Sequence, residues 1–186
     1  MRKIALPFLF AALLAWPRPG ITSDYELLDN GGFEDGLQAP WGTGQYAEKG
    51  KDGWWNSNGC KAAATADHAV YRTGKTSLHI VNASARSPHI FGSTAQRIQV
   101  NPGQRYKITL WAKGKDLASK GAVSIIADSA WNIRPVSLPA GTFDWQKFEG
   151  TFELPVKDAD IRILVEDKGE AWIDDVSVTP LVDDLY

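Results

Sequence analysis

The sequence predicts an all-β fold, a two-sheet antiparallel β-sandwich of the jelly-roll type. From residue 76 onward apolar and polar residues alternate with a period of two, and the alternating runs are short. Gly, Pro, Asn and Asp turns separate the runs, and no stretch carries an amphipathic helical period of useful length. Regularly spaced short strands without helices are typical of sandwiches and jelly rolls.

The expected strands follow one another along the chain. The longest patterns cover 76–81, 105–113 and 147–154, and the turns at 101–103 and 138–141 contain the Pro and Gly that tight connections favour. Half-buried antiparallel strands have this alternation, with one face in the core. The residues expected to face the core are Leu78, Ile80, Tyr106, Ile108, Leu110, Ala112, Val123, Ile125, Ala127, Phe148, Phe152, Leu154, Ile161, Ile163 and Val165. Residues 42–60 have no clear period and are predicted to form a long loop, a segment type that often carries function.

Residues 1–23 are expected to be a secretory signal peptide. Arg2 and Lys3 form a basic start, and the following apolar run, 4–16, is too short to span a membrane comfortably. The cleavage site is open between Ala15 and Ser23, and an uncleaved amphipathic or core helix is the alternative. We therefore expect a secreted protein, extracellular or periplasmic, in which 24–186 forms a single domain.

Composition narrows the partners. Without 1–23 the chain has 17 basic and 22 acidic residues, a net charge of −5, which argues against binding to nucleic acid. Cys60 is the only cysteine, so no internal disulfide is possible. Seven of the eight tryptophans lie outside 1–23, and such a number suits either a stacking surface or the core.

Two short signatures near the ends place carboxylates where an apolar pattern does not need them. The first is NGGFEDG at 30–36, and the second is the strand-like AWIDDVSV at 171–178. If the two ends lie side by side, Glu34 and the pair Asp174 and Asp175 could share a hard cation such as calcium, which takes clustered oxygen ligands. The alternative is that these carboxylates cap turns without an ion.

Five segments follow one another along the chain: LLDNGGFEDG (27–36), VYRTGKTSLHI (70–80), VNPGQRYKITLWAKG (100–114), WQKFEGTFELP (145–155) and AWIDDVSV (171–178). In this order they resemble the carbohydrate-binding modules of families four, nine and twenty-two, which are galactose-binding-like jelly rolls. The resemblance implies a structural calcium near the termini and a groove for soluble glycan chains across one concave sheet. Carried over to this chain, it assigns the metal to Glu34 and to Asp174 or Asp175, with backbone carbonyls near Gly32.

A sugar-binding surface needs flat aromatic rings and planar polar groups at their edges. By strand parity Trp111 points away from the core and is the preferred platform, with Arg162 and Glu166 as polar contacts. Three further tryptophans are expected in loops that form the cleft walls: Trp54, Trp55 and Trp131. Each has a plainer alternative: Trp111 covered by the 42–60 loop, one of the adjacent tryptophans buried, and Arg162 and Glu166 a solvated ion pair.

These features predict a secreted, non-catalytic domain that binds a polysaccharide or oligosaccharide chain, such as β-glucan or xylan, in an aromatic-lined cleft. A separate glycan-degrading enzyme is the expected companion, since no catalytic motif stands out in this chain. The first alternative is a structural or adhesion role, which an extensive apolar patch around Trp54, Trp55 and Trp131 without flanking polar groups would favour. The second is a glycan hydrolase or lyase, which two convergent carboxylates in the groove would favour.

Overall fold

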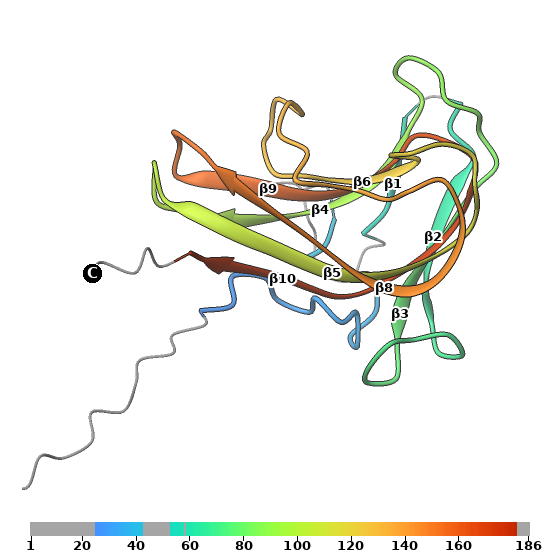
Figure 1. Ribbon diagram of the computed structural model, residues 1–186, viewed down its shortest axis with the longest axis horizontal. Helices are drawn as coiled ribbons and strands as arrows, with labels where there is room; N and C mark the ends of the chain where they lie inside the picture. Colours follow the sequence, from blue (N-terminus) through green and yellow to red (C-terminus); the bar gives the residue numbers. More distant parts are fainter. Residues whose placement is uncertain (1–24, 43–52, 58, 182–186) are drawn as a thin grey trace, which may run out of the picture.

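The computed structural model describes residues 25–42, 53–57 and 59–181, and within them the chain forms strands and turns without a helix. The strands stack as two layers (Figure 1). Their bounds are β1 (Trp55–Asn56), β2 (Ala62–Asp67), β3 (Ser77–Asn82), β4 (Gly92–Gln99), β5 (Arg105–Leu117), β6 (Val123–Ile126), β7 (Val136–Ser137), β8 (Gly141–Glu153), β9 (Asp158–Val165) and β10 (Gly169–Pro180).

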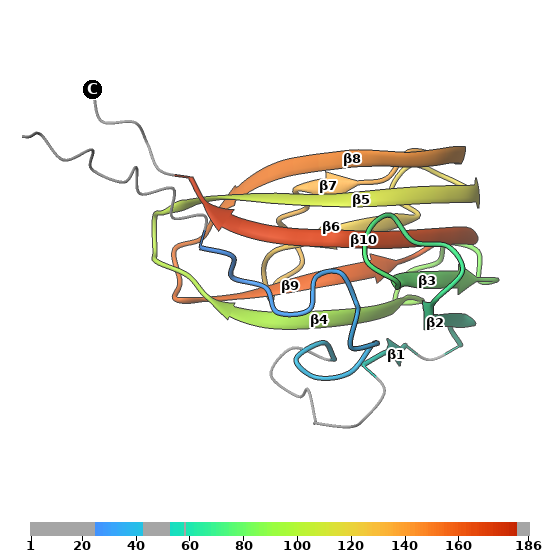
Figure 2. The ribbon, with the colours of Figure 1, turned by 90° about the horizontal axis from the view of Figure 1, so that it is seen from below.

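Each layer is a five-stranded antiparallel sheet. The first, called the β9 sheet, has the order β1-β4-β9-β6-β7, and the second, called the β10 sheet, has the order β2-β3-β10-β5-β8 (Figure 2). Most neighbours within a sheet are not consecutive in sequence, so the chain crosses repeatedly between the layers. The predicted two-sheet antiparallel sandwich is confirmed. Within the described residues, no helix is long and apolar enough to cross a membrane.

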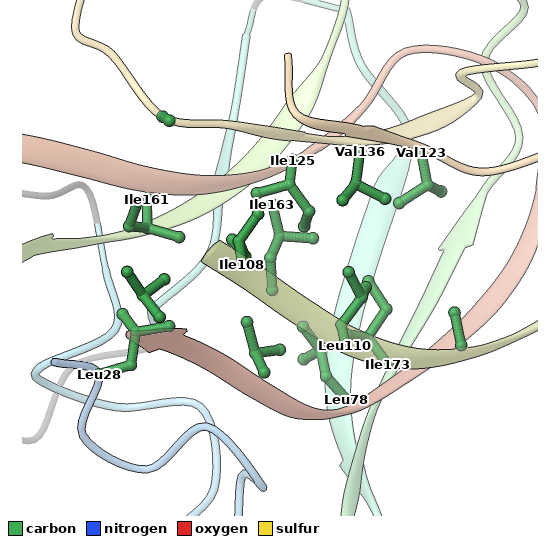
Figure 3. Close-up of a cluster of buried hydrophobic side chains, with 14 of the residues drawn as sticks. Leu28, Leu78, Ile108, Leu110, Val123, Ile125, Val136, Ile161, Ile163 and Ile173 are labelled. Carbon is green, nitrogen blue, oxygen red and sulfur yellow. The ribbon is translucent and has the colours of Figure 1, made fainter. Parts of the chain in front are cut away.

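The core fills the space between the two sheets with the residues that the alternation selected. Val123, Ile125 and Val136 project from the β9 sheet toward Leu110 and Ile173 of the β10 sheet (Figure 3). The predicted inward set is buried in β3, β5, β6 and β9, while Phe148 of β8 is only partly buried. Because a fully buried aliphatic side chain contributes about 1.5–3 kcal/mol, this layer supplies most of the driving force for folding.

The N-terminal segment lies along β10, where β3 no longer pairs with it. Leu27 N donates to Val178 O at 3.0 Å, and Val176 N donates to Gly31 O at 3.0 Å. A Cβ at position 31 would lie 1.9 Å from the Val176 carbonyl oxygen, so only glycine allows this approach. Phe33 is fully buried beside Trp41. The two segments that contain the signatures are therefore side by side, which is the condition for Glu34 and the aspartates to share one site.

Carboxylates from both signatures hold one turn, 72–76, between β2 and β3. Glu34 Oε1 accepts hydrogen bonds from the backbone N–H groups of Lys75 at 2.9 Å and Thr76 at 3.1 Å. Asp174 Oδ2 accepts from the backbone N–H groups of Arg72 and Thr73, at 2.8 and 3.2 Å. We call this arrangement of Glu34, Asp174 and turn 72–76 the carboxylate clasp. It ties the start, the middle and the end of the chain together.

Asp174 is fully buried within the clasp. Burial raises the pKa of its carboxyl, and the backbone N–H groups of Arg72 and Thr73 oppose that rise. Its second oxygen, Oδ1, accepts from the backbone N–H of Asp175 at 2.7 Å, while Asp175 Oδ1 accepts from the Thr73 hydroxyl at 2.6 Å. Because a buried acceptor without donors costs about 1–3 kcal/mol, these main-chain amides are what makes the buried carboxylate tolerable.

The clasp predicts different costs for two otherwise similar substitutions, Gly74→Ala and Gly103→Ala. Both glycines are exposed and have positive φ, 60° and 76°. A Cβ at 74 would lie 2.0 Å from Glu34 Oε1, while a Cβ at 103 meets nothing within 4 Å. We expect Gly103→Ala to lower the free energy of unfolding by about 1–2 kcal/mol through backbone strain, and Gly74→Ala by a further 1–3 kcal/mol or so through lost clasp hydrogen bonds. Urea unfolding followed by circular dichroism measures both.

Glu34→Ala provides the control, because it removes the atom that the new Cβ would strike. In that background, adding Gly74→Ala should cost no more than Gly103→Ala does in the parent protein. Equal costs for the two glycine substitutions in the parent protein would contradict the role assigned to Glu34.

Candidate functional site

The outer face of the β9 sheet, the face turned away from the β10 sheet, is the candidate site. Along β9 the residues Ile161 and Ile163 belong to the core cluster, so Arg162 and Leu164 point the other way. Both are nevertheless buried, with 8% and 0% of their surface exposed, and so is Ile126 on neighbouring β6. Side chains therefore cover both faces of this sheet.

Strand register places small residues on the floor of this face. One row across the sheet runs from β1 through β4 and β9 to β6 and contains Trp55, Ser93, Leu164 and Ser124 in that order. In the next row Arg162 lies between Ala95 and Ile126. Serine and alanine at these positions leave room above the sheet for the long Arg162 side chain and for rings from the surrounding loops.

Three aromatic rings gather above that floor. Trp55 comes from β1, Phe91 from the position just before β4, and Trp131 from the β6–β7 loop, which rises on the outer side of the sheet (Figure 1). The ring centroids of Trp55 and Phe91 are 5.2 Å apart, and those of Phe91 and Trp131 are 4.7 Å apart in an edge-on arrangement. Trp55 retains 45% of its surface exposed. An exposed ring of this kind offers a flat apolar platform to solvent.

Arg162 lies beneath the rings. Its Cζ atom is 4.8 Å from the Trp131 ring centroid, and its Nη1 donates to Ser93 Oγ at 3.0 Å. Burial lowers the pKa of the guanidinium, and the nearby Asp160 carboxylate opposes that shift. In the part of the chain that the structure describes, its Nε has no hydrogen-bond partner. We call Trp55, Phe91, Trp131 and Arg162 the aromatic–arginine cluster.

The acidic residues around the cluster are already paired. Glu166 accepts two hydrogen bonds from Arg134, at 2.7 and 3.3 Å, and lies 3.7 Å from Arg86. Asp160 is held by Arg97 through two bonds of 2.8 and 2.9 Å. The paired arrangement that the sequence suggested for Arg162 and Glu166 is therefore not seen, because Glu166 binds other arginines.

The structure brings together three of the predicted binding residues, Trp55, Trp131 and Arg162. Trp55 lies in a short strand, so its assignment to a loop was wrong, whereas Trp131 is in a loop as expected. Phe91 was missed, because a single Phe after a run without clear alternation gives no sign that its ring meets two tryptophans. Residues 43–52 and 58 of the expected 42–60 loop lie outside the described residues.

Trp54 and Trp111 lie apart from the cluster. Trp54 packs against the core and borders a cavity of about 460 Å³ beside β2, with Leu37 on its wall. Trp111 is on the outer face of the β10 sheet, opposite Asp174 in the strand register, and the Arg72 guanidinium carbon lies 4.2 Å from its ring centroid. One of the adjacent tryptophans was expected to be buried, and Trp54 is partly buried. Among the described residues, Arg72 lies over the Trp111 ring.

The predicted metal ligands meet at the carboxylate clasp. A Cβ added at Gly32 would lie 3.6 Å from Asp174 Oδ1 and 3.9 Å from Asp175 Oδ1, and Glu34 is also adjacent. Within residues 25–42, 53–57 and 59–181, no three His, Cys, Asp or Glu side chains are arranged to hold a metal by themselves. No basic side chain forms a salt bridge with these carboxylates in the same residues. The hard oxygens fit calcium chemically, provided that backbone carbonyls complete the shell.

Comparison with protein families gives one match. The model of a family described as a carbohydrate binding domain matches residues 25–171, which is most of the chain. No match was found among the curated proteins.

Several solved structures are similar to this chain. TmCBM61 in complex with beta-1,4-galactotriose has a TM-score of 0.59 at 16% identity, covering 84% of this chain and 99% of that one. A CBM4 structure has a TM-score of 0.54 at 20% identity, covering 82% and 99%. The CBM22-1 xylan-binding domain of Xyn10C from Paenibacillus barcinonensis has a TM-score of 0.51 at 12% identity, covering 76% and 90%. At these identities the likeness concerns the fold.

Proposed function

The chain belongs to the carbohydrate-binding-domain family, and from this premise we propose that it is a secreted, non-catalytic domain that holds a soluble polysaccharide or oligosaccharide chain on the outer face of the β9 sheet. The observation that carries the proposal is the aromatic–arginine cluster. It combines the exposed Trp55 ring with a second ring, Trp131, and a planar donor group, Arg162. Candidate ligands are β-glucan, xylan and β-1,4-galactan, and a separate glycan-degrading enzyme would act on the same chain.

The chemistry of a sugar ring suits this surface. A pyranose has an apolar face that stacks on an aromatic ring, and hydroxyl groups at its rim that accept and donate hydrogen bonds. Contacts of this type exchange for water and leave a modest net energy, so we expect dissociation constants from micromolar to millimolar, about 4–8 kcal/mol.

The state of the carboxyl groups favours binding over catalysis. A glycoside hydrolase needs a carboxyl group with a raised pKa as its acid. Of the described acidic residues, Asp174 is the one whose pKa is raised, and it lies in the carboxylate clasp. Near the cluster, Asp160 and Glu166 are paired with arginines.

The polar surroundings of the cluster also favour a glycan over a protein partner. An adhesion surface was expected to present an apolar patch without flanking polar groups. Here Arg162 lies beneath Trp131. The ion pair of Arg134 and Glu166 flanks them in the sequence, since Arg134 follows Trp131 in the same loop and Glu166 follows Arg162 just after the end of β9. Trp54, which would have enlarged such a patch, packs against the core instead.

Alanine substitutions of three tryptophans test where the glycan binds. We expect Trp55→Ala and Trp131→Ala to weaken binding about tenfold or more, which corresponds to about 1.4 kcal/mol, because each removes a stacking ring. Trp111→Ala should leave binding unchanged, because that ring lies on the other sheet beneath Arg72. Affinity gel electrophoresis in soluble β-glucan, xylan and β-1,4-galactan measures the effect.

Thermal unfolding of each variant separates loss of binding from loss of structure. If Trp111→Ala is no longer retarded by the glycan in the gel while Trp55→Ala and Trp131→Ala still are, the binding site lies on the β10 sheet. A parent protein that migrates alike with and without every glycan would refute the binding function for those glycans.

We also propose that the carboxylate clasp binds calcium through Glu34, Asp174 and Asp175, with a backbone carbonyl near Gly32. Burial and the Asp175 charge both raise the pKa of the Asp174 carboxyl, Glu34 lies beside Gly32 as these two do, and no basic side chain forms a salt bridge with the three among the described residues. Like charges at close range repel unless a cation or proton compensates them. The ion would supply that compensation and add a further link between the ends of the chain.

Chelation tests the calcium proposal. Adding calcium at about 100 times its dissociation constant should stabilise the protein by about 2.7 kcal/mol and raise the melting temperature by several degrees, and EDTA should reverse the shift. Differential scanning fluorimetry measures it. Glu34→Gln should abolish the calcium-dependent part of the shift. If the carboxylates only cap the turn, Glu34→Gln will lower the melting temperature equally with calcium and with EDTA.

A further inference from the structure

Charge pairing around the aromatic–arginine cluster leaves one guanidinium without a carboxylate in contact. Arg97 binds Asp160, and Arg134 binds Glu166. Arg86 lies 3.7 Å from both Glu166 and Asp167, so these three carboxylates, Asp160, Glu166 and Asp167, are taken. For Arg162, in the part of the chain that the structure describes, no carboxylate lies within ion-pair distance.

Asp160 does not replace such a partner. It lies two residues from Arg162 on the same face and attracts the guanidinium, but Arg97 already donates to both of its oxygens. The strongest direct contact of Arg162 is with a neutral hydroxyl, Ser93 Oγ. Burying a charge is costly unless it is paired and hydrogen-bonded, so an arginine left in this state marks a position where an anion is accommodated.

The geometry leaves the required hydrogen-bond donor free. The guanidinium lies over the Trp131 ring, with Cζ 4.8 Å from the ring centroid, and it carries its N–H donors in one plane. Nη1 is used by Ser93, and Nε is a buried donor without a partner. Arginine recognises carboxylates through parallel N–H donors in that plane. The contact with Trp131 uses none of the N–H donors, so Nε is not occupied by it.

We propose that the glycan bound by this domain is acidic, and that Arg162 receives the carboxylate of a uronic acid residue whose ring stacks on the tryptophans of the cluster. The proposal rests on the proposed function and names the class of ligand for the same site. Trp55 is near enough to share one sugar, because it pairs in register with Ser93, the residue to which Arg162 donates. Since Nε is buried, a ligand reaches it only when a neighbouring side chain moves.

Matched acidic and neutral glycans test this inference. The probes are polygalacturonate, glucuronoxylan and alginate, each with a portion in which the carboxyl groups have been chemically reduced to alcohols. We expect the parent protein to bind at least one acidic polymer about tenfold more tightly than its reduced form, with weaker binding as salt is added and a change in tryptophan fluorescence. Isothermal titration calorimetry on soluble fragments gives the two affinities.

Arg162→Gln should reduce the affinity for the acidic polymer to that for the reduced form. Arg105→Gln is the control, because it removes the same charge from an exposed position on β5 in the other sheet and should change neither affinity. Melting temperatures establish that both variants fold, and the comparison of glycan pairs with the parent protein does not depend on either variant.

The outcomes separate the inference from the proposed function. Equal affinity of the parent protein for every acidic polymer and its reduced form would overturn the uronic acid inference and leave glycan binding in place. An equal loss in Arg162→Gln and Arg105→Gln would also overturn it, since the effect would then be one of net charge. Failure to bind any acidic or neutral glycan would overturn both.

Discussion

Hydrogen bonds from the main-chain amides of turn 72–76 to two carboxylates, the exposed Glu34 and the fully buried Asp174, fix the N-terminal segment and β10 against the turn between β2 and β3. Glu34 belongs to the N-terminal segment and Asp174 to β10, yet Glu34 Oε1 and Asp174 Oδ2 both accept hydrogen bonds from the same turn between β2 and β3. The segment containing Glu34 also completes the sheet edge that β3 leaves, through its pairing with β10. The start, middle and end of the chain are therefore fixed relative to one another by a few charge-assisted hydrogen bonds, which are stronger than bonds between neutral groups.

With its ends fixed in this way, the sandwich presents two outer faces that differ in chemistry. On the β10 sheet, neighbouring strands place opposite charges side by side, as in the pairs Lys107–Glu149 and Lys115–Glu170, and Trp111 is covered by Arg72. The charged side chains of such a surface are paired with one another and hydrated. On the β9 sheet, small residues line the floor, loops bring aromatic rings above it, and a guanidinium is buried with one donor unused. Among the described residues two buried side-chain nitrogens have no hydrogen-bond partner: Arg162 Nε on this face, and His79 Nε2 on β3 of the β10 sheet, 3.4 Å from Glu170. The β9 sheet is therefore the one that combines an unused donor with an exposed aromatic ring.

The residues predicted from the sequence to bind sugar divide between these two faces for a physical reason. A period of two says whether a side chain points into the core or away from it, and it placed Arg162 and Trp111 correctly on outward positions. It does not say to which sheet a strand belongs. The order of the sheets puts β5 and β9 in different layers, so two outward side chains that seemed equivalent lie on opposite sides of the molecule. Likewise, the sequence identifies Glu166 as a polar residue on an outward position, but its ion pair with Arg134 depends on the path of the β6–β7 loop.

The sequence by itself determined the all-β sandwich and most of the inward-facing residues, and it raised the possibility that the two terminal signatures meet. These follow from local alternation, turn chemistry and the cost of leaving carboxylates unpaired in an apolar strand, all of which can be read along the chain. Only the tertiary structure decided what those carboxylates bind, which sheet each tryptophan serves, and that Phe91 joins Trp55 and Trp131. Those outcomes depend on strand order and on loops that bring together residues far apart in sequence, and hydrophobic periodicity contains no information about either.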